Sequence, residues 1–154
     1  MSLNLNSEAQ TNILELVGFT IANEFFALEI NSIREIIKVN DITRVPNTPN
    51  YIKGVINLRG KVIPIIDMRK KLNLKQIDYD KNTRIIILEF NNMIVGIIVD
   101  SVREVLRIDS TVTEPPPSIV KGGNSDYITA VGKLDDKLIN ILNLDYLLNN
   151  HLSE

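Results

Sequence analysis

Side chains able to do covalent chemistry are few in this chain of 154 residues. It contains no cysteine, which excludes thiolate nucleophiles, disulfides and cysteine-ligated zinc. Its single histidine, His151, lies three residues from the end, where chains are usually poorly ordered. A catalytic site needs a nucleophile, a base and an orienting group that can meet, and no such set is recognisable.

Acidic residues are plentiful, so the inventory alone does not exclude a serine–lysine or paired-carboxylate site. However, Asp135-Asp136 falls in an expected turn, and residues 78–80 have the character of a solvated linker. Gly122-Gly123 is not followed by the lysine and hydroxyl residue of a phosphate-binding loop. The sequence therefore predicts a protein that is not an enzyme and needs neither cofactor nor metal.

Charge and hydropathy exclude two further classes of protein. The net charge is −2 and the basic residues are scattered, whereas nucleic-acid binders concentrate them on one face. The start of the chain is polar, which does not fit a signal peptide. The longest apolar runs, such as Met93–Val99, are far shorter than the ~20 residues that span a bilayer. We expect a cytoplasmic protein that binds no nucleic acid and does not insert into a membrane.

Short β-rich runs separated by turn residues make up most of the chain, which predicts an all-β fold. Four hairpins are expected, at 13–30, 54–67, 84–99 and 128–142, and short helical turns at 68–72 and 144–148. Pro64 lies within an apolar run and cannot donate a ladder hydrogen bond. Its strand is therefore expected at a sheet edge or at a bulge.

An internal repeat is the most informative feature. A shift of 69 positions (104 − 35 = 69) places Ser32–Ile36 over Ser101–Val105 without a gap, and Pro46 over Pro115. After seven extra residues, Val62–Asp67 falls over Leu138–Asn143. Hydrophobic periodicity alone would not reproduce Ser-x-Arg-Glu and the proline in one frame. We infer a duplication.

Duplication predicts two similar lobes, one at about 13–75 and the other at about 83–148, preceded by a disordered segment at 1–10. A lobe of this size buries only ~60% of its unfolded surface, so the two are expected to pack along a shared apolar seam. A crevice at such a junction leaves open a second function, a β module that binds a small molecule.

Two charged residues stand out as candidates for protein binding. Glu35 alternates with apolar residues, and on pattern alone it is best explained as the polar face of a half-buried strand. Arg59 lies in an expected turn where Gly60 supplies a positive φ, and on pattern alone it is a solvated turn residue. An arginine on a rigid turn is nevertheless well placed to bind a carboxylate of a partner.

The run Tyr51–Asp67, YIKGVINLRGKVIPIID, resembles the signature of the CheW family of chemotaxis coupling proteins. Thr48-Pro49, Ile33–Ile36, Val95–Asp100 and the stretch 127–148 extend the resemblance over residues 14–148. The family signature also occurs in the regulatory domain of the chemotaxis kinase and in an adaptor fused to a receiver domain. Because no receiver, dimerisation or ATP-binding segment flanks the repeats here, a stand-alone coupler is expected.

The resemblance implies two five-stranded, SH3-like β-barrel lobes. It also implies a non-catalytic adaptor that binds the regulatory domain of the chemotaxis histidine kinase and the cytoplasmic tip of methyl-accepting chemoreceptors. The family's partner-sensitive positions fall on Ile33, Glu35, Gly54 and Arg59, which reverses the pattern-only interpretation of the two charged residues. An apolar seam is further expected to grip the receptor's helical hairpin, and it contains Ile33, Ile36, Val99 and Val102.

Overall fold

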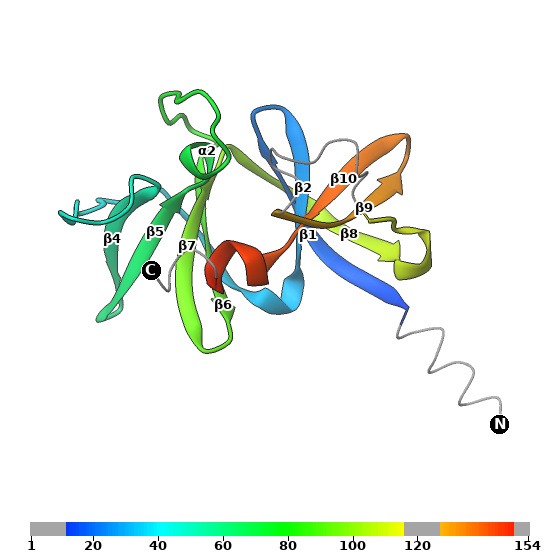
Figure 1. Ribbon diagram of the computed structural model, residues 1–154, viewed down its shortest axis with the longest axis horizontal. Coiled ribbons are helices and arrows are strands. Elements are labelled where there is room, and N and C mark those ends of the chain that lie inside the picture. Colours follow the sequence, from blue (N-terminus) through cyan, green and yellow to red (C-terminus); the bar gives the residue numbers. More distant parts are fainter. Residues whose placement is uncertain (1–11, 116–126, 150–154) are drawn as a thin grey trace. The chain divides into compact units, whose positions relative to one another are not determined.

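The computed structural model describes residues 12–115 and 127–149 (Figure 1). The expectations for residues 1–10, Gly122-Gly123 and His151 lie outside these ranges. The strands are β1 (Ile13–Ile21), β2 (Glu24–Glu29), β3 (Ile33–Lys38), β4 (Ile52–Leu58), β5 (Lys61–Asp67), β6 (Arg84–Phe90), β7 (Met93–Val99), β8 (Ser101–Asp109), β9 (Ile128–Leu134) and β10 (Lys137–Leu142). The short helical elements are η1 (Ile30–Ser32), α2 (Met68–Lys71), η2 (Ser110–Val112) and η5 (Asp145–Asn149). The all-β prediction is confirmed.

The strands form two five-stranded sheets with the same topology. One has the order β8-β1-β2-β10-β9 and the other the order β3-β6-β7-β5-β4. Each contains one parallel pair, β10 with β2 and β5 with β7. Ile141 faces Ala27 in the first pair and Ile65 faces Gly96 in the second. These positions correspond under the repeat (27 + 69 = 96 and 65 + 76 = 141), so the two sheets are duplicates in register as well as in order.

Neither sheet comes from one continuous stretch of chain. The described residues of unit 1 are 12–18, 25–30, 103–115 and 127–149, and those of unit 2 are 19–24 and 31–102. The expected division at 13–75 and 83–148 is therefore wrong. Each repeat supplies its first hairpin, β1–β2 or β6–β7, to the sheet that holds the last three strands of the other repeat. The repeat was found by sequence similarity, which does not reveal an exchange of equivalent hairpins.

Each sheet encloses its own apolar core, and the two cores use equivalent positions. The buried core of unit 1 includes Leu16, Leu106, Ile108, Ile139 and Ile141, and that of unit 2 includes Ile56, Ile63, Ile65, Ile85, Ile87 and Ile98. Leu16 corresponds to Ile85 (16 + 69 = 85) and Ile139 to Ile63 (63 + 76 = 139). Alternating strand residues place these side chains on one face of each sheet. Apolar residues at equivalent positions of the two repeats explain how both sheets keep the same fold.

All four hairpins close through two residues with positive φ, a geometry that matches the twist of the flanking strands. Two of the turns, Asn91-Asn92 and Asp135-Asp136, use residue types that tolerate this conformation. The other two place Ala22 and Arg59 at φ values of 53° and 51°. The expected hairpins are thus present, with turns one residue shorter than the three-residue connections predicted at three of them.

Pro64 lies in β5, which is an interior strand rather than an edge strand. The prediction of an edge is therefore wrong. The parallel pairing of β5 with β7 begins at Ile65, so Pro64 precedes the first residue that pairs on that side. On its other side Pro64 faces Val55, which directly follows a register shift in β4 between Ile52 and Gly54. The expected irregularity thus lies in the paired strand, next to the proline. A proline fits here because the parallel ladder of β5 with β7 starts only after Pro64.

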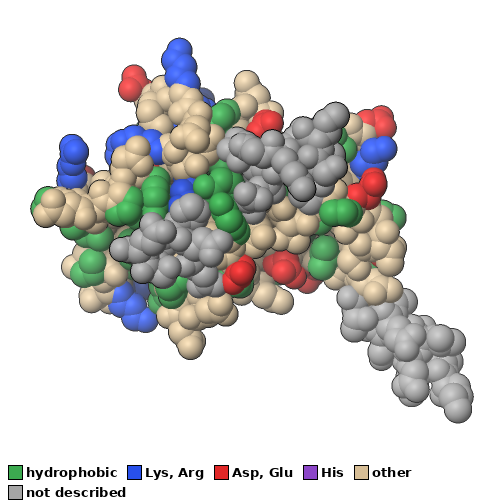
Figure 2. Space-filling view, viewed as in Figure 1, with side chains coloured by type: hydrophobic (Ala, Val, Ile, Leu, Met, Phe, Trp, Pro, Cys, Tyr) green, Lys and Arg blue, Asp and Glu red, His purple; other side chains and the backbone are tan. Residues whose placement is uncertain are grey.

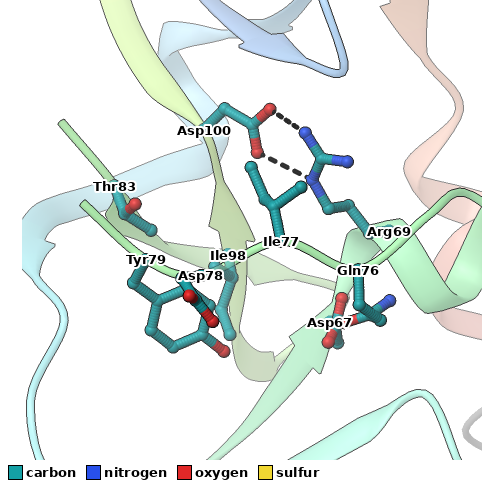
Figure 3. Close-up of a pocket in the computed structure, with 9 residues that line it drawn as sticks. All are labelled: Asp67, Arg69, Gln76, Ile77, Asp78, Tyr79, Thr83, Ile98 and Asp100. Carbon is teal, nitrogen blue, oxygen red and sulfur yellow. Dashed lines mark hydrogen bonds and ion pairs between the residues drawn. The ribbon is translucent and has the colours of Figure 1, made fainter.

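Asp100 joins three segments within unit 2. Its carboxylate accepts hydrogen bonds from Arg69 Nε at 3.2 Å and Nη2 at 2.5 Å, and from the backbone N–H of Ala22 at 2.8 Å. Figure 3 shows Arg69 extending from α2 toward this carboxylate, with Ile77 beside the pair. Arg69 also donates to the carbonyl of Lys75 at 2.6 Å. Because Arg69 and Asp100 are only 13% and 26% exposed, their attraction is weakly screened by water.

We expect Asp100→Ala to lower the free energy of unfolding by about 1–3 kcal/mol, since it removes the acceptor of two Arg69 hydrogen bonds and of the Ala22 N–H. Glu15→Ala is the matched control, because it breaks an exposed ion pair with Arg107 and should cost less than about 1 kcal/mol. Urea unfolding of both variants measures the difference. Equal losses would contradict the role given to Asp100.

Candidate functional site

Unit 2 brings Arg59 and Glu35 together at a hollow in its surface. Arg59 occupies the turn between β4 and β5, and Glu35 lies on β3. The guanidinium forms an ion pair with the Glu35 carboxylate through Nη2, and its Nη1 lies 3.5 Å from Oε2. We call this hollow the Arg59–Glu35 site, and its lining residues are Arg34, Glu35, Leu58, Arg59, Lys61, Ile63, Ile87 and Ile94.

The turn that carries Arg59 is rigidly built. Gly60 has φ +84°, and a Cβ added to it would meet no atom within 4 Å. Its N–H donates to Asn57 Oδ1 at 3.0 Å. Arg59 itself adopts a left-handed conformation that non-glycine residues seldom take, which costs conformational free energy. The first turn residues of the other three hairpins, Ala22, Asn91 and Asp135, have φ values of 50° to 53°, so the two-residue turn imposes this conformation on Arg59.

Electrostatics at this site favour an ionised Glu35. The hydrogen bond from Arg59 is the main reason why the pKa of the Glu35 carboxyl lies below its usual value. Burial opposes this effect, and the positive charges of Arg59 and Arg34 lower the pKa by smaller amounts. The same hydrogen bond raises the pKa of Arg59. Arg34 pairs with Glu89 on the neighbouring strand β6 at 2.6 Å. Arg59, the most exposed of these charges at 72%, can reach a partner's carboxylate without leaving Glu35.

The floor of the hollow is apolar and narrow. It is formed by Leu58, Ile63, Ile87 and Ile94 beneath the charged rim, and its volume is about 80 Å³. Small-molecule sites usually enclose roughly 300–1,000 Å³, so this hollow has room for one or two side chains of a partner. An apolar floor with a charged rim is the arrangement of an interface hot spot.

The remaining predicted site residues divide into surface and buried positions. Ile36 is 39% exposed, and Ile33 and Val102 are half-buried. Val99 has no exposed surface, so it cannot contact a partner in this conformation and its expected place in a binding seam is wrong. Alternation of apolar residues could not distinguish these positions, because it marks a strand face without saying what covers that face.

Gly54 is also buried, and its role is structural. It lies next to the bridge in which Thr43 and Val55 exchange two backbone hydrogen bonds of 2.8 Å. A Cβ at Gly54 would overlap the Thr43 carbonyl oxygen and lie 2.8 Å from Ile42 Cγ2. The expectation that it contacts a partner is therefore replaced by a requirement for close backbone approach.

Several residues of the site were missed by sequence reasoning. Lys61 lies one residue beyond the turn glycine, and Ile87 and Ile94 come from the second repeat. The register in which Glu35 faces Ile87 was the missing information, since it depends on the hairpin exchange. The alternation of β5, with Ile63 inward and Val62 69% exposed, was the available signal.

The chemistry that this site offers is recognition by charge and apolar contact. Its carboxylate and guanidinium hold one another, and no nucleophile and base meet there. Within residues 12–115 and 127–149, no three His, Cys, Asp or Glu side chains gather closely enough to hold a metal ion. No helix in the same part of the chain is long and apolar enough to cross a membrane.

The pKa of Glu35 tests the ion pair directly. We expect Arg59→Ala to raise this pKa toward its usual value, and Arg34→Ala to raise it less, because Arg59 also donates a hydrogen bond. Because the folded-state pKa is lowered, the stabilisation is complete above the unfolded-state pKa and is lost as pH falls through the folded-state value. Carbon-13 NMR titration of the carboxyl provides the measurement. An unchanged pKa in Arg59→Ala would show that the pair does not form in solution.

We expect Gly54→Ala to lower the free energy of unfolding by about 2–3 kcal/mol, because the added Cβ overlaps backbone. Gly60→Ala is the matched control, since a Cβ there meets nothing within 4 Å and only the positive φ is strained, at about 1 kcal/mol. Thermal or urea unfolding compares them. A Gly54→Ala protein as stable as the wild type would restore this position as a candidate contact.

Comparisons with known proteins show the family to which the chain belongs. A family model described as a CheW-like domain matches residues 15–151. The chain is 37% identical over 136 residues to "Chemotaxis protein CheW" of Klebsiella aerogenes, covering 88% of this chain and 82% of that protein. It is 37% identical over 147 residues to the protein of the same name from Helicobacter pylori, covering 96% and 88%.

A solved structure is similar as well. The crystal structure of scaffolding protein TtCheW from Thermoanaerobacter tengcongensis superposes with a TM-score of 0.81 at 40% identity, covering 87% of this chain and 91% of that one. The predicted fold class of two SH3-like β lobes is thereby supported together with the two five-stranded sheets. With a family model that spans most of its length and relatives of this similarity, the chain belongs to the CheW-like domain family.

Proposed function

We propose that this protein is a chemotaxis adaptor that works in the cytoplasm. It binds the regulatory domain of the chemotaxis histidine kinase and the cytoplasmic tip of methyl-accepting chemoreceptors in one ternary complex. Relatives named as chemotaxis proteins and a structural neighbour named as a scaffolding protein support this role. The observation that carries it is the Arg59–Glu35 site, whose exposed arginine is fixed by a rigid turn above an apolar hollow.

The Arg59–Glu35 site suits a protein partner better than a metabolite. Its hollow holds only about 80 Å³, whereas its rim presents three cations, Arg34, Arg59 and Lys61, beside one carboxylate. An apolar side chain of a partner can fill the hollow while a partner carboxylate binds the free edge of the Arg59 guanidinium. At this site no observation favours the alternative of a small-molecule-binding module.

The receptor's helical hairpin requires an apolar surface in addition to charge. Ile33, Ile36 and Val102 all belong to unit 2 and present part of their side chains to solvent. We assign the receptor contact to these three residues, as the apolar anchors of helix-in-groove recognition.

An adaptor of this kind acts by proximity and stiffness. Holding a kinase and a receptor on one body raises the effective concentration of each for the other. Short two-residue turns and paired strands leave little flexible backbone in each sheet. A change in the geometry of the receptor can therefore be passed to the kinase as a rigid-body movement.

The test of the proposed function is assembly from three purified components. The full chain is mixed with the kinase regulatory domain and a receptor signalling fragment and analysed by sedimentation velocity. We expect a single species that contains all three proteins, and kinase activity that responds to the receptor only when the chain is present. Binding to neither partner by a folded chain would refute the proposal.

Substitution of Arg59 locates one interface. We expect Arg59→Ala to weaken binding to at least one of the two partners by roughly tenfold, since a truncated hot-spot arginine commonly loses this much. Arg107→Ala is the matched control. Arg107 is 73% exposed and pairs with Glu15 on a neighbouring strand in unit 1, but lies outside the site. Isothermal titration against each partner separately gives the two affinities, and identical values for both variants would remove Arg59 from the interface.

A further inference from the structure

A second feature of unit 2 is a hollow of about 420 Å³ beside the loop that connects β3 and β4. We call it the basic groove and define it by the cations Arg44, Lys53 and Lys70 and the apolar residues Val45, Pro46 and Pro49. A neighbouring hollow shares Lys53 and Lys70 and extends the surface to Ile77, which is 49% exposed. Figure 2 shows basic side chains close to hydrophobic ones over the part of the surface that carries β4, β5 and α2.

The three cations are not neutralised by the chain itself. In the part of the chain that the structure describes, four ion pairs form, and none includes Arg44, Lys53 or Lys70. Asp78 shares the neighbouring hollow with Lys53 and Lys70 but forms no ion pair with either. Lys53 lies 5.5 Å from the centroid of the Tyr79 ring, an interaction that leaves its positive charge in place. Uncompensated cations gathered on a protein of net charge −2 create a local positive potential.

The loop beside the groove is stiff, so its surface is formed before any partner arrives. Pro46 and Pro49 fix two φ angles, and Thr48 Oγ1 donates to the Val45 carbonyl at 3.0 Å. Ile52 N–H donates to the Pro49 carbonyl at 3.0 Å, which ties the end of the loop to β4. A preformed surface loses little conformational entropy on binding.

We propose that the basic groove docks an acidic peptide segment of a partner protein, one that carries apolar side chains between its carboxylates. Carboxylates would lie against Arg44, Lys53 and Lys70, and apolar side chains against the prolines and Ile77. A nucleic acid is a poorer fit, since it would need a longer row of cations and gains nothing from an apolar floor. The groove is separate from the residues of the Arg59–Glu35 site, so this inference does not depend on the proposed coupling function.

The test uses the full chain, labelled with nitrogen-15, and a short synthetic peptide of glutamate and leucine. Two further peptides replace its glutamates by glutamine or its leucines by serine. The test variant is Lys53→Glu with Lys70→Glu. Its matched control is Lys81→Glu with Lys133→Glu, which changes the net charge equally at exposed residues outside the groove.

We expect saturable shifts at the amides of Arg44, Lys53, Lys70 and Ile77 with the glutamate–leucine peptide, and weaker binding of both altered peptides. Binding should fall about tenfold in the groove variant, whereas the control variant should bind like the wild type. Equal weakening in both variants would show that only net charge matters and would overturn the proposal. Preference for single-stranded RNA or for vesicles of anionic lipid over the peptide would also overturn it, in favour of a different partner.

Discussion

The length of one connection limits how this protein can be built. β7 ends at Val99 and β8 begins at Ser101, so only Asp100 lies between them. In a lobe made of one repeat, β8 would lie beside β6, two strand spacings or about 9.6 Å away from β7. Two residues of extended chain reach only about 7 Å, so the chain cannot make that connection. β8 therefore joins the sheet that holds β1 and β2. Its counterpart β3, which follows the three residues of η1, takes the equivalent place beside β6.

The exchange of hairpins also shapes the functional surface. The Arg59–Glu35 site takes its rim from the first repeat and Ile87 and Ile94 of its floor from the second, so neither repeat carries it alone. Duplication did not copy the site. The equivalents of Glu35 and Arg59 are Glu104 and Asp135, two acids that cannot form an ion pair. One copy carries the Arg59–Glu35 pair, while the other retains the same fold with different charges at the equivalent positions.

Local features were predicted well from the sequence because they depend on neighbouring residues. The paired Asn91-Asn92 turn and the helix that begins after Asp67 need only short-range chemistry, and both are present. The composition of the lobes was not predictable in this way, because hairpin exchange concerns residues far apart in the chain. Gly54 was assigned to a binding surface through the family resemblance and Val99 through the expected apolar seam. Neither assignment could foresee burial, which for Gly54 comes from Ile42 and Thr43 packing against it. Glu35 and Arg59 were identified through family resemblance, since each alone looks like an ordinary surface charge.

Cutting the chain in the connector at residues 73–83 tests the exchange of hairpins most directly. Each fragment then holds one complete repeat, and each lacks the hairpin that its last three strands require. We expect both fragments to be unfolded alone by circular dichroism and NMR, and an equimolar mixture to recover the spectrum of the intact chain. Cooperative folding of either fragment by itself, with native-like amide shifts, would show that a repeat can close on its own hairpin and would contradict the account.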